Sequence, residues 1–414
     1  CTQPDHISSD IEPDSVVSSP TLPPTQCDRH RMPWHQLTQS QRELYINGLR
    51  TLSAMGRLRV FTETHANVIA AGQAHETSAF LPWHRYFLWE LESQFRALGG
   101  EYECFGLPYW DWSYEVEQFG LNYQDYHILH SGLGGDGTAN DNNCLNDGSV
   151  FSKGNYVPFD CTRTGRNGQC CLQRSVCDNN GNGCTMSSAA HMISNIAQWD
   201  FYGTDFGGNT ILNPGYRESL ETEVHTPAHN VIGGGGHLGD PFTSPDDPIF
   251  YLLHSFVDYN WALWQDCHDF DTVAKQVIHD DVYVGVTNGR RTVGPSDIDD
   301  VLIYTELAQY DWSYIATHPN PTSRDMHSLS DWDVSYERGT FWQLARVDDV
   351  CSNINPTWFY DTVTADRRRL SEIENGFAYD VFVRLNNSLR IRDEVDKKRL
   401  LKKWNKLNCE YLHI

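Results

Sequence analysis

The sequence predicts a mainly α-helical protein with long loops between its helices. Three segments support this class, because apolar residues recur at three- or four-residue steps in residues 38–61, 84–95 and 248–264. Residues 132–184 are instead rich in Gly, Asn and Asp, a composition typical of loops, and are expected to form an insertion between two helical halves. At 414 residues the chain is long enough to bury a substantial core.

The N-terminal residues 1–30 are expected to form an extended arm. They are rich in Ser, Pro and Asp and show no apolar period. Cys1 and Cys27 could tie this arm down. After the arm, one helix is expected from about residue 38 to residue 61, with Thr38 or Ser40 as its N-cap.

Two further helices are expected to carry histidines. One begins near His84 and ends at a Leu-Gly-Gly sequence, and the other begins near Pro248 and carries His254. Beyond residue 316 the composition changes, and residues 317–414 are expected to form a C-terminal extension that ends in a basic amphipathic helix. Such a charge pattern indicates either a solvated face or a docking surface, and the sequence leaves that choice open.

The charge balance restricts the possible partners. The 55 acidic residues exceed the 31 basic ones by 24, so the surface repels phosphate backbones and anionic lipids. No apolar run approaches the roughly 18 residues that a membrane-spanning helix needs. We therefore expect a soluble protein that binds neither nucleic acid nor membranes.

Five of the 12 cysteines crowd into the loop-like insertion. They do not follow the paired C-x2-C spacing of a zinc knuckle, so disulfide bonds are favoured over a metal site. Disulfides persist in oxidising compartments, and Asn386 begins an Asn-Asn-Ser glycosylation sequon, so we expect a secreted glycoprotein. The cysteines expected to form disulfides are Cys161, Cys170, Cys171, Cys177 and Cys184.

Two histidines in the sequence ETEVHTPAHN have the spacing of metal ligands. His225 and His229 are four residues apart, which on a helix places both imidazoles on one face. Such a pair alone is often a surface accident, but His254 follows on the next apolar helix. Asp258, four residues after His254, is expected to accept the second N–H of that imidazole and so to orient the ring.

A second histidine group precedes this one in the chain and consists of His65, His75 and His84. His75 is expected in a loop, so the three can converge only through tertiary folding, and each could instead be a hydrogen-bonded core histidine. Two three-histidine sets without nearby cysteines favour an all-nitrogen metal site. Imidazole suits copper, zinc and iron, so these residues alone leave the metal open.

Four segments resemble the signature segments of the tyrosinase family, which includes catechol oxidases and molluscan hemocyanins. In chain order they are HETSAFLPWHRYFLWELE, LPYWDWS, HTPAHNVIGG and DDPIFYLLHSFVDYNWALWQ. The resemblance covers about residues 60–266. It implies a central four-helix bundle that holds a dinuclear copper centre, with dioxygen as co-substrate.

The resemblance also implies a ligand set and domain limits. The first copper, CuA, would be held by His65, His75 and His84, and the second, CuB, by His225, His229 and His254. The dicopper domain would occupy residues 31–316, with a CuA half at 60–115, the Cys-rich insertion at 132–184 and a CuB half at 210–266.

Three further residues receive a role from the resemblance. Phe250 would pack over the CuB pocket. Glu221 would supply the carboxylate that helps efficient tyrosinases to hold a proton-accepting water, although a solvated charge at the start of a helix is the alternative. Thr226 stands where those enzymes have Asn, and its shorter side chain predicts weak activity on monophenols.

The sequence departs from the family pattern at three points. His65 and His75 are only ten residues apart. No cysteine lies between His65 and His84, so the thioether found in many relatives cannot form there. Leu253 replaces the first histidine of the usual His-His pair. These departures leave open zinc in place of copper, and a silent site in place of an active one.

The expected function is a secreted copper oxidase that converts o-diphenols to o-quinones with dioxygen and acts weakly on monophenols. Two alternatives remain: a structural or assembly protein with an altered or silent metal site, and a hemocyanin-like oxygen carrier. The expected partners are phenolic small molecules or the tyrosyl and DOPA side chains of proteins. Self-assembly could use the N-terminal arm or the C-terminal extension.

Overall fold

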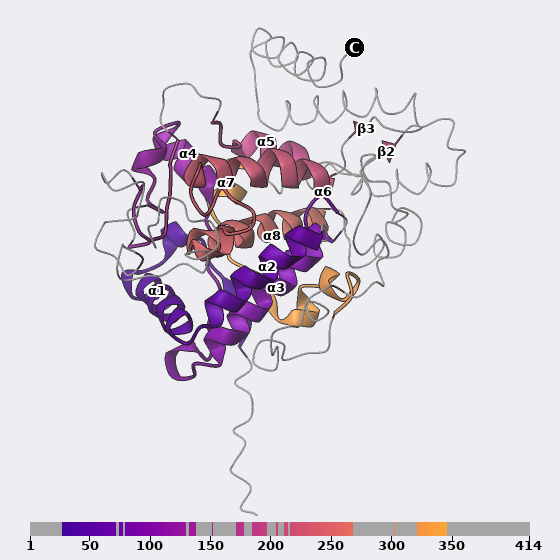
Figure 1. The fold of residues 1–414 in the computed structure, drawn as a ribbon. Helices are drawn as coiled ribbons and strands as arrows, with labels where there is room; N and C mark the ends of the chain where they lie inside the picture. Colours follow the sequence, from indigo (N-terminus) through magenta and orange to yellow (C-terminus); the bar gives the residue numbers. More distant parts are fainter. Residues whose placement is uncertain are drawn as a thin grey trace, which may run out of the picture.

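The structure, a computed structural model, describes residues 27–71, 74–77, 79–129, 132–137, 171–177, 184–196, 204–205, 211–213, 216–267 and 321–345, together with residues 151 and 302. It is mainly α-helical, as predicted (Figure 1). The α-helices are α1 (Gln39–Ala54), α2 (Arg57–Ala71), α3 (Phe80–Arg96), α4 (Trp112–Phe119), α5 (Ala189–Ile196), α6 (Tyr216–Ser219), α7 (Thr226–Gly233), α8 (Ile249–Cys267) and α10 (Thr340–Ala345). The strands of the described part are β1 (Arg29–Arg31), which pairs with β4 (Val334–Tyr336), and β2 (Thr204–Asp205), which pairs with β3 (Ile211–Asn213).

Two helices occupy the stretch in which one was expected. Thr38 caps α1 as predicted, because its side chain accepts the N–H of Gln41 while the Gln41 side chain accepts the N–H of Thr38. The first helix ends and the second begins on either side of Gly56, whose φ is +74°. The prediction of a single helix over 38–61 is therefore wrong, because a left-handed glycine ends a helix.

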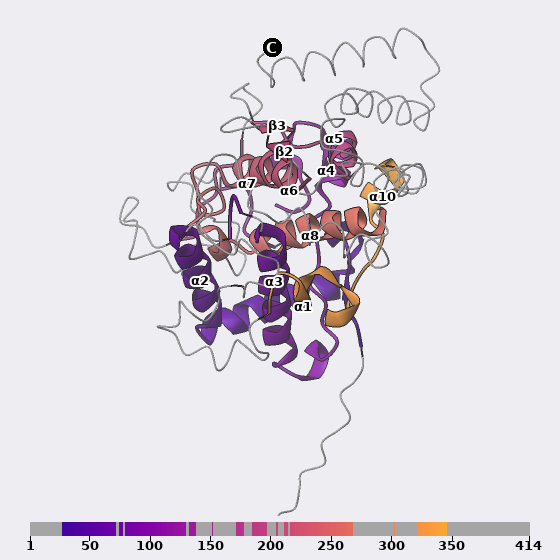
Figure 2. The ribbon, with the colours of Figure 1, turned by 90° about the vertical axis from the view of Figure 1, so that its right-hand side faces the viewer.

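Helices α2, α3, α7 and α8 form the central bundle (Figure 1, Figure 2). Helix α3 packs against α8, and a π-helical turn, Leu220–His225, connects α6 to α7 and also packs against α8. Aromatic rings join α2 to this pair, since Phe61 lies 5.1 Å from Phe87 of α3 and 6.5 Å from Tyr251 of α8, measured between ring centroids. This bundle is the architecture that the resemblance implies.

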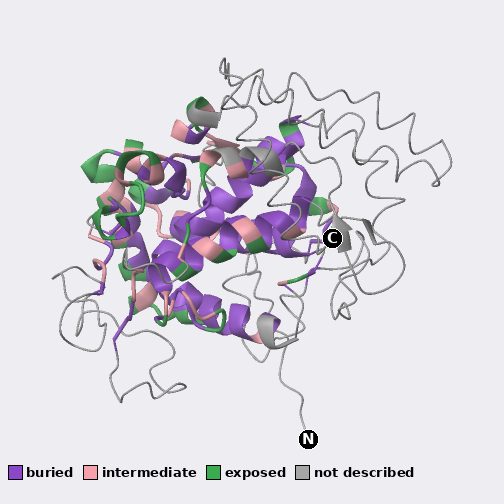
Figure 3. Ribbon diagram, turned by 90° about the horizontal axis from the view of Figure 1, so that it is seen from above, coloured by how far each residue is buried: buried purple, intermediate pink, exposed green. Residues whose placement is uncertain are grey.

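Buried residues gather in the central helices (Figure 3), and α8 is the most enclosed of them. Every residue of α8 except Asp266 is buried, which explains why this helix is apolar on nearly all sides. No helix of the described residues is long and apolar enough to cross a membrane. The largest fully buried apolar side chains are those of Trp34, Trp83, Trp110, Trp112, Trp261 and Trp264.

Residues 321–345 pack onto the helical core, so the fold continues past the boundary expected at residue 316. Strand β4 pairs in parallel with β1, and Arg85 of α3 donates to the backbone carbonyls of Met326 and His327. This segment, orange in Figure 1, therefore belongs to the same packed unit as α3. The predicted separation of a C-terminal extension at residue 317 is corrected, because these pairings connect residues too far apart in sequence for a local pattern to indicate.

A disulfide fixes the start of the described chain to a turn that follows α3. Cys27 pairs with Cys104, so Cys27 does tie down the end of the arm, as expected, whereas Cys1 lies outside the described residues. Strand β1 begins at Arg29, inside the arm expected over residues 1–30. The packed fold therefore begins earlier than predicted.

Part of the Cys-rich insertion is also disulfide-bonded. Cys177 pairs with Cys184, and Cys171 is disulfide-bonded, as predicted for all three, and Cys267 is disulfide-bonded as well. Cys161, Cys170, the sequon at Asn386 and the basic C-terminal segment lie outside the described residues.

A buried ion network joins β1, α3, α8 and β4. Asp258 accepts hydrogen bonds from Nε of Arg85 at 2.6 Å, from Nη1 of Arg31 at 2.9 Å and from the Tyr336 hydroxyl at 2.5 Å. Arg31 also binds both carboxylate oxygens of Glu92, each at 2.8 Å. The charged side chains of these ion pairs are 0% to 3% exposed, so moving one element would leave a buried charge unpaired.

Candidate metal centre

The six predicted histidines come together in two triads. Within each triad one nitrogen from every imidazole lies within 4.8 Å of the other two. Helices α2, α3, α7 and α8, the π-helical turn and one loop supply them, so the arrangement depends on the folded bundle. The first triad is His65, His75 and His84, and the second is His225, His229 and His254.

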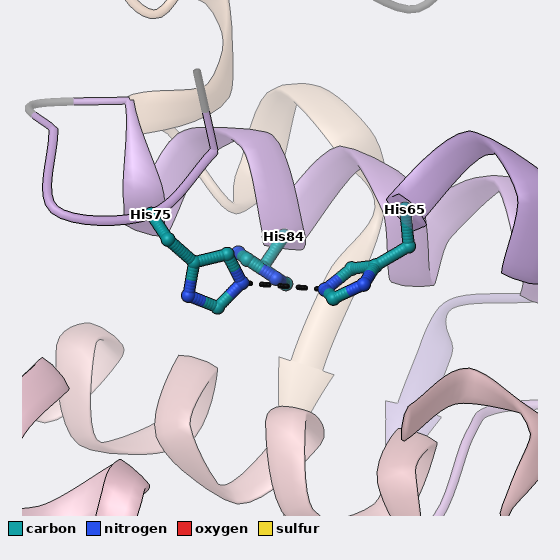
Figure 4. Close-up of side chains that lie close together, drawn as sticks. All are labelled: His65, His75 and His84. Carbon is teal, nitrogen blue, oxygen red and sulfur yellow. Dashed lines mark hydrogen bonds between the residues drawn. The ribbon is translucent and has the colours of Figure 1, made fainter. Parts of the chain in front are cut away.

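Figure 4 shows the first triad with its three rings turned toward one another. His65 extends from α2, His84 from the first turns of α3, and His75 from the loop between these helices. The Nε2 atoms of His65 and His75 are 3.3 Å apart. The short ten-residue connection noted in the sequence is therefore long enough to bring both rings to one point.

The second triad combines a π-helical turn with two α-helices. His225 is the last residue of the π-helical turn, His229 lies in α7, and His254 lies in α8. The His225 and His229 rings are neighbours, with centroids 4.5 Å apart, as the four-residue spacing predicts. The π-helical turn itself was not predicted. Such turns are rare and often occur at functional sites.

The two triads are in direct contact with each other. The rings of His84 and His254 stack with centroids 4.3 Å apart and an interplanar angle of 10°. The rings of His75 and His225 lie 5.7 Å apart. The geometry therefore describes one centre with two adjacent ligand sets.

The hydrogen bonds of the second triad leave nitrogen lone pairs that suit a bound cation. His225 donates its Nδ1–H to the carbonyl of Glu221 at 3.1 Å, and His229 donates to the carbonyl of Leu238 at 2.7 Å. A neutral imidazole has one N–H, so the Nε2 atoms of both rings carry lone pairs. They lie 3.3 and 3.2 Å from Nε2 of His254, and at most one of these contacts can be a hydrogen bond. A cation shared by the three nitrogens would remove the remaining repulsion.

The first triad also has nitrogen lone pairs that suit a bound cation. His84 donates its Nδ1–H to the carbonyl of Phe80 at 2.8 Å, and its buried Nε2 has no hydrogen-bond partner among the described residues. Nδ1 of His75 lies 3.3 Å from a carboxylate oxygen of Glu221, which favours the proton on Nδ1 and leaves the lone pair on Nε2. Buried nitrogens that take no hydrogen bond are suited to metal ligation.

Five of the imidazoles are neutral near pH 7. Burial, and then neighbouring histidines, hold the pKa values of His65, His84, His225 and His254 well below the ordinary value, and burial lowers the pKa of His229 to about 4. Neutral imidazole is the form that binds a metal. Neither triad includes a thiolate or carboxylate, so the donor set remains one that suits copper, zinc or iron.

Two fully buried phenylalanines lie between the triads. Phe250 is 4.2 Å from His254 and 5.2 Å from His65, measured between ring centroids. Phe80 lies 4.9 Å from His84 and 5.0 Å from His225. Phe250 thus lies against the second triad, where the resemblance places it, and Phe80, which the resemblance implies as part of an apolar shell around the site, is a neighbour of both triads.

Asp258 does not orient His254, contrary to the prediction from their spacing. Its carboxylate is occupied by two guanidinium groups and the Tyr336 hydroxyl, and Nδ1 of His254 has no hydrogen-bond partner among the described residues. Helical spacing brings the two side chains to neighbouring turns, but charged donors compete better than an imidazole N–H for a buried carboxylate.

Glu221 is buried, so the alternative of a solvated helix-start charge is wrong. Its Oε1 accepts the N–H of Glu76 at 2.7 Å and lies 3.3 Å from Nδ1 of His75, and its Oε2 accepts from Arg217 at 2.5 Å. Burial raises the pKa of Glu221, but the contacts with His75 and Arg217 outweigh it and hold the pKa below its ordinary value. The only local signal for Arg217 is its position four residues before Glu221, the spacing of an ion pair on a helix.

Thr226 follows His225 directly, but its hydroxyl is already engaged. The hydroxyl donates to the backbone carbonyl of Glu221 at 2.9 Å, and the residue is exposed. The oxygen can still accept a hydrogen bond, while its single donor is taken.

Comparisons with known proteins agree with this geometry. Residues 53–267 match the model of the common central domain of tyrosinase. A tyrosinase from Streptomyces antibioticus is 30% identical over 244 residues, which cover 56% of this chain and 81% of the relative. A tyrosinase-like protein from Diaporthe leptostromiformis is 29% identical over 267 residues, which cover 59% of this chain and 66% of the relative.

A solved structure shares the fold. It is a mutant polyphenol oxidase from Thermothelomyces thermophila, with a TM-score of 0.52 and 20% identity, and the match covers 74% of this chain and 87% of that one. Both triads lie within or between elements of the region that matches the tyrosinase model. The chain therefore belongs to the tyrosinase family of copper oxidases, and its two histidine triads could bind a dinuclear copper centre that uses dioxygen as co-substrate.

Proposed function

We propose that this chain oxidises o-diphenols to o-quinones with dioxygen and acts poorly on monophenols. The observation that carries the proposal is the contact between the triads, in which His84 stacks on His254 at 4.3 Å. Two adjacent sets of three imidazoles suit a copper pair that handles two electrons together. The tyrosinase of Streptomyces antibioticus supports the same class of reaction by its name and similarity.

The six histidines of the two triads would hold the two coppers, three to each ion. When bound, the copper pair supplies the redox chemistry that passes electrons from the phenol to dioxygen. Each o-diphenol loses two electrons and two protons as it becomes an o-quinone, so two o-diphenols reduce one dioxygen to two waters. The buried rings of Phe80 and Phe250 exclude water from the imidazoles and restrict the space beside them.

Poor activity on monophenols follows from two groups beside the second triad. Hydroxylating a monophenol requires a base for the phenol proton. Both carboxylate oxygens of Glu221 are engaged, by Glu76 and His75 on one side and by Arg217 on the other. The Thr226 hydroxyl uses its only donor on a backbone carbonyl, so it cannot orient a water as an amide would. An o-diphenol is more acidic and needs this assistance less.

Oxygen uptake by the copper-loaded full chain tests the proposal with catechol and tyrosine as substrates. Catechol should be oxidised rapidly and tyrosine slowly, and His254→Ala should abolish both activities because it removes a second-triad histidine. His127→Ala is the matched control, since that side chain is 52% exposed and lies outside both triads. Equal rates on tyrosine and catechol would contradict the argument from Glu221 and Thr226.

Two other outcomes would indicate a different function. Reversible oxygenation without quinone formation would indicate an oxygen carrier. Two bound coppers with neither oxygenation nor turnover would indicate a structural or assembly protein with a silent site. A peptide that contains DOPA should be compared with free catechol, because we propose either small phenols or protein tyrosyl and DOPA side chains as the natural partners.

We further propose that the protein is secreted and glycosylated at Asn386. The bonds Cys27–Cys104 and Cys177–Cys184 support an oxidising compartment. Mass spectrometry before and after reduction should find most or all of the 12 cysteines in disulfides, and glycosidase treatment should lower the mass of the protein from its source. A mostly reduced protein would contradict secretion, and an unchanged mass after glycosidase treatment would contradict glycosylation. Self-association through the N-terminal arm, residues 1–30, or the C-terminal extension, residues 317–414, is a further proposal. Sedimentation of the full chain against chains that begin at residue 27 or end at residue 345 would test it, because these truncations keep the segments that pack onto the helical core.

A further inference from the structure

His75 differs from the other five histidines of the two triads because no helix holds it. It lies in a short non-helical segment, residues 74–77, between α2 and α3, and its side chain is 20% exposed. The other five lie in helices or in the π-helical turn and are 9% exposed or less. A metal site needs all its ligands held in position, so the loop requires support from elsewhere.

That support comes from the element that carries the second triad. Glu221 lies in the π-helical turn that ends at His225, yet its carboxylate reaches the loop of the first triad. One oxygen, Oε1, lies 3.3 Å from Nδ1 of His75 and accepts the backbone N–H of Glu76 at 2.7 Å. One carboxylate oxygen therefore contacts both the imidazole and the backbone that follows it.

The backbone of Glu76 also needs such support. Its φ is +57°, in the left-handed region that side-chain-bearing residues rarely adopt. A strained conformation of this kind persists only where the surrounding structure holds it. The hydrogen bond from the Glu76 N–H to Glu221 is a direct restraint on it.

Arg217 holds the carboxylate itself in position. Its Nη1 donates to Oε2 of Glu221 at 2.5 Å, and the two side chains are 4% and 5% exposed. The pair is four residues apart, so it spans the junction of α6 with the π-helical turn. Because Oε2 is bound to Arg217, Oε1 is directed to the loop.

We propose that Glu221 is a positioning residue for His75, through which the element that carries the second triad holds the loop ligand of the first. The carboxylate takes the Nδ1 side of the ring, so Nε2 faces the Nε2 of His65, 3.3 Å away. Glu221 acts through His75 and does not touch the substrate in this role. The inference concerns copper binding and is independent of which phenol is oxidised.

Copper titrations of the full chain test the proposal one site at a time. In a His229→Ala background only the first triad is complete, and in a His65→Ala background only the second is complete. Cu(I) affinity is measured by competition with a chromophoric chelator after the copper has been removed and returned. Glu221→Gln should lower Cu(I) affinity about 10–100-fold in the His229→Ala background, the usual effect of losing a group that orients a ligand, and leave it unchanged in the His65→Ala background.

Glu223→Gln is the matched control. It makes the same substitution in the same π-helical turn, on a partly exposed side chain that lies 3.0 Å from His191, outside both triads. It should leave Cu(I) affinity unchanged in both backgrounds. Thermal unfolding of the metal-free variants, followed by circular dichroism, shows whether the fold is intact.

Two results would overturn the proposal. One is unchanged first-triad affinity in folded Glu221→Gln, and the other is equal weakening of both sites, which would make Glu221 a general structural residue. If Glu221→Gln does not fold, Glu221→Asp replaces it, because it keeps the charge beside Arg217 and shortens the reach to His75. The same selective loss at the first triad supports the proposal, and wild-type affinity in Glu221→Asp overturns it.

Discussion

Replacing Asp258 by Asn should destabilise the metal-free protein by about 3 kcal/mol. Asp258 is the carboxylate that pairs with Arg85 in the described part of the chain, at 2.6 Å, and both side chains are buried. The variant leaves the Arg85 guanidinium without a counter-charge in a place where water cannot replace it. Breaking a buried ion pair on one side costs about 3–5 kcal/mol.

The lower end of that range applies because the second guanidinium keeps a partner. Arg31 loses its 2.9 Å contact with Asp258 but retains both oxygens of Glu92 at 2.8 Å. The amide that replaces the carboxylate would also still offer one acceptor oxygen to the donors around it. Only one charge is therefore left without a counter-charge.

Urea unfolding of metal-free full-length protein, followed by tryptophan fluorescence, measures the difference. Arg59→Gln is the control, because the Arg59–Glu63 pair has a similar length, 2.9 Å, but Arg59 is 66% exposed. Exposed pairs contribute less than about 1 kcal/mol, so this variant should change the free energy of unfolding little. If the two variants differ by less than about 1 kcal/mol, the argument that burial makes the Asp258 pair strong is wrong.

Three further outcomes are expected. Protein never exposed to a chelator should contain two coppers per chain by metal analysis, whereas a full complement of zinc, or one metal per chain, would contradict the assignment of both triads to copper. Thr226→Asn should raise the monophenol rate relative to the diphenol rate, because the amide supplies donors that the engaged hydroxyl lacks, and an unchanged ratio of the two initial rates would count against that reasoning. Gly106→Ala should cost about 1–3 kcal/mol in urea unfolding, because its Cβ would clash with the backbone oxygen of His30, while Gly235→Ala, whose Cβ would meet no described residue within 4 Å, should change stability little.

The helices that carry metal-site histidines could be predicted because their signals are local. Helices α3 and α8 have dense apolar residues at helical spacing, and the structure contains both, although α3 begins at Phe80, four residues before the predicted start. The break between α1 and α2 is also local, but a single residue, Gly56, encodes it. A continuous apolar period on either side outweighed that one signal and produced the wrong single helix.

The contacts that support the site could not be predicted because they are not local. Arg31 and Tyr336 are opposite each other in the β1–β4 ladder although 305 residues separate them in the chain. Glu221 binds the backbone of Glu76 across 145 positions, and no spacing rule connects a helix to a loop at that distance. Sequence patterns identified the histidines because metal chemistry restricts residue types, whereas the side chains that hold them are ordinary charged residues.

The failed prediction for Asp258 reveals what fixes the distance between the triads. Arg85 directly follows His84 on α3, and Asp258 lies one turn beyond His254 on α8. The ion pair between Arg85 and Asp258 therefore joins the two helices close to the point where His84 and His254 stack at 4.3 Å. A shift of either helix by one residue would turn its side chains by about 100° and break both contacts together. Asp258 thus acts on the centre by fixing α3 against α8, which serves both triads and not one imidazole.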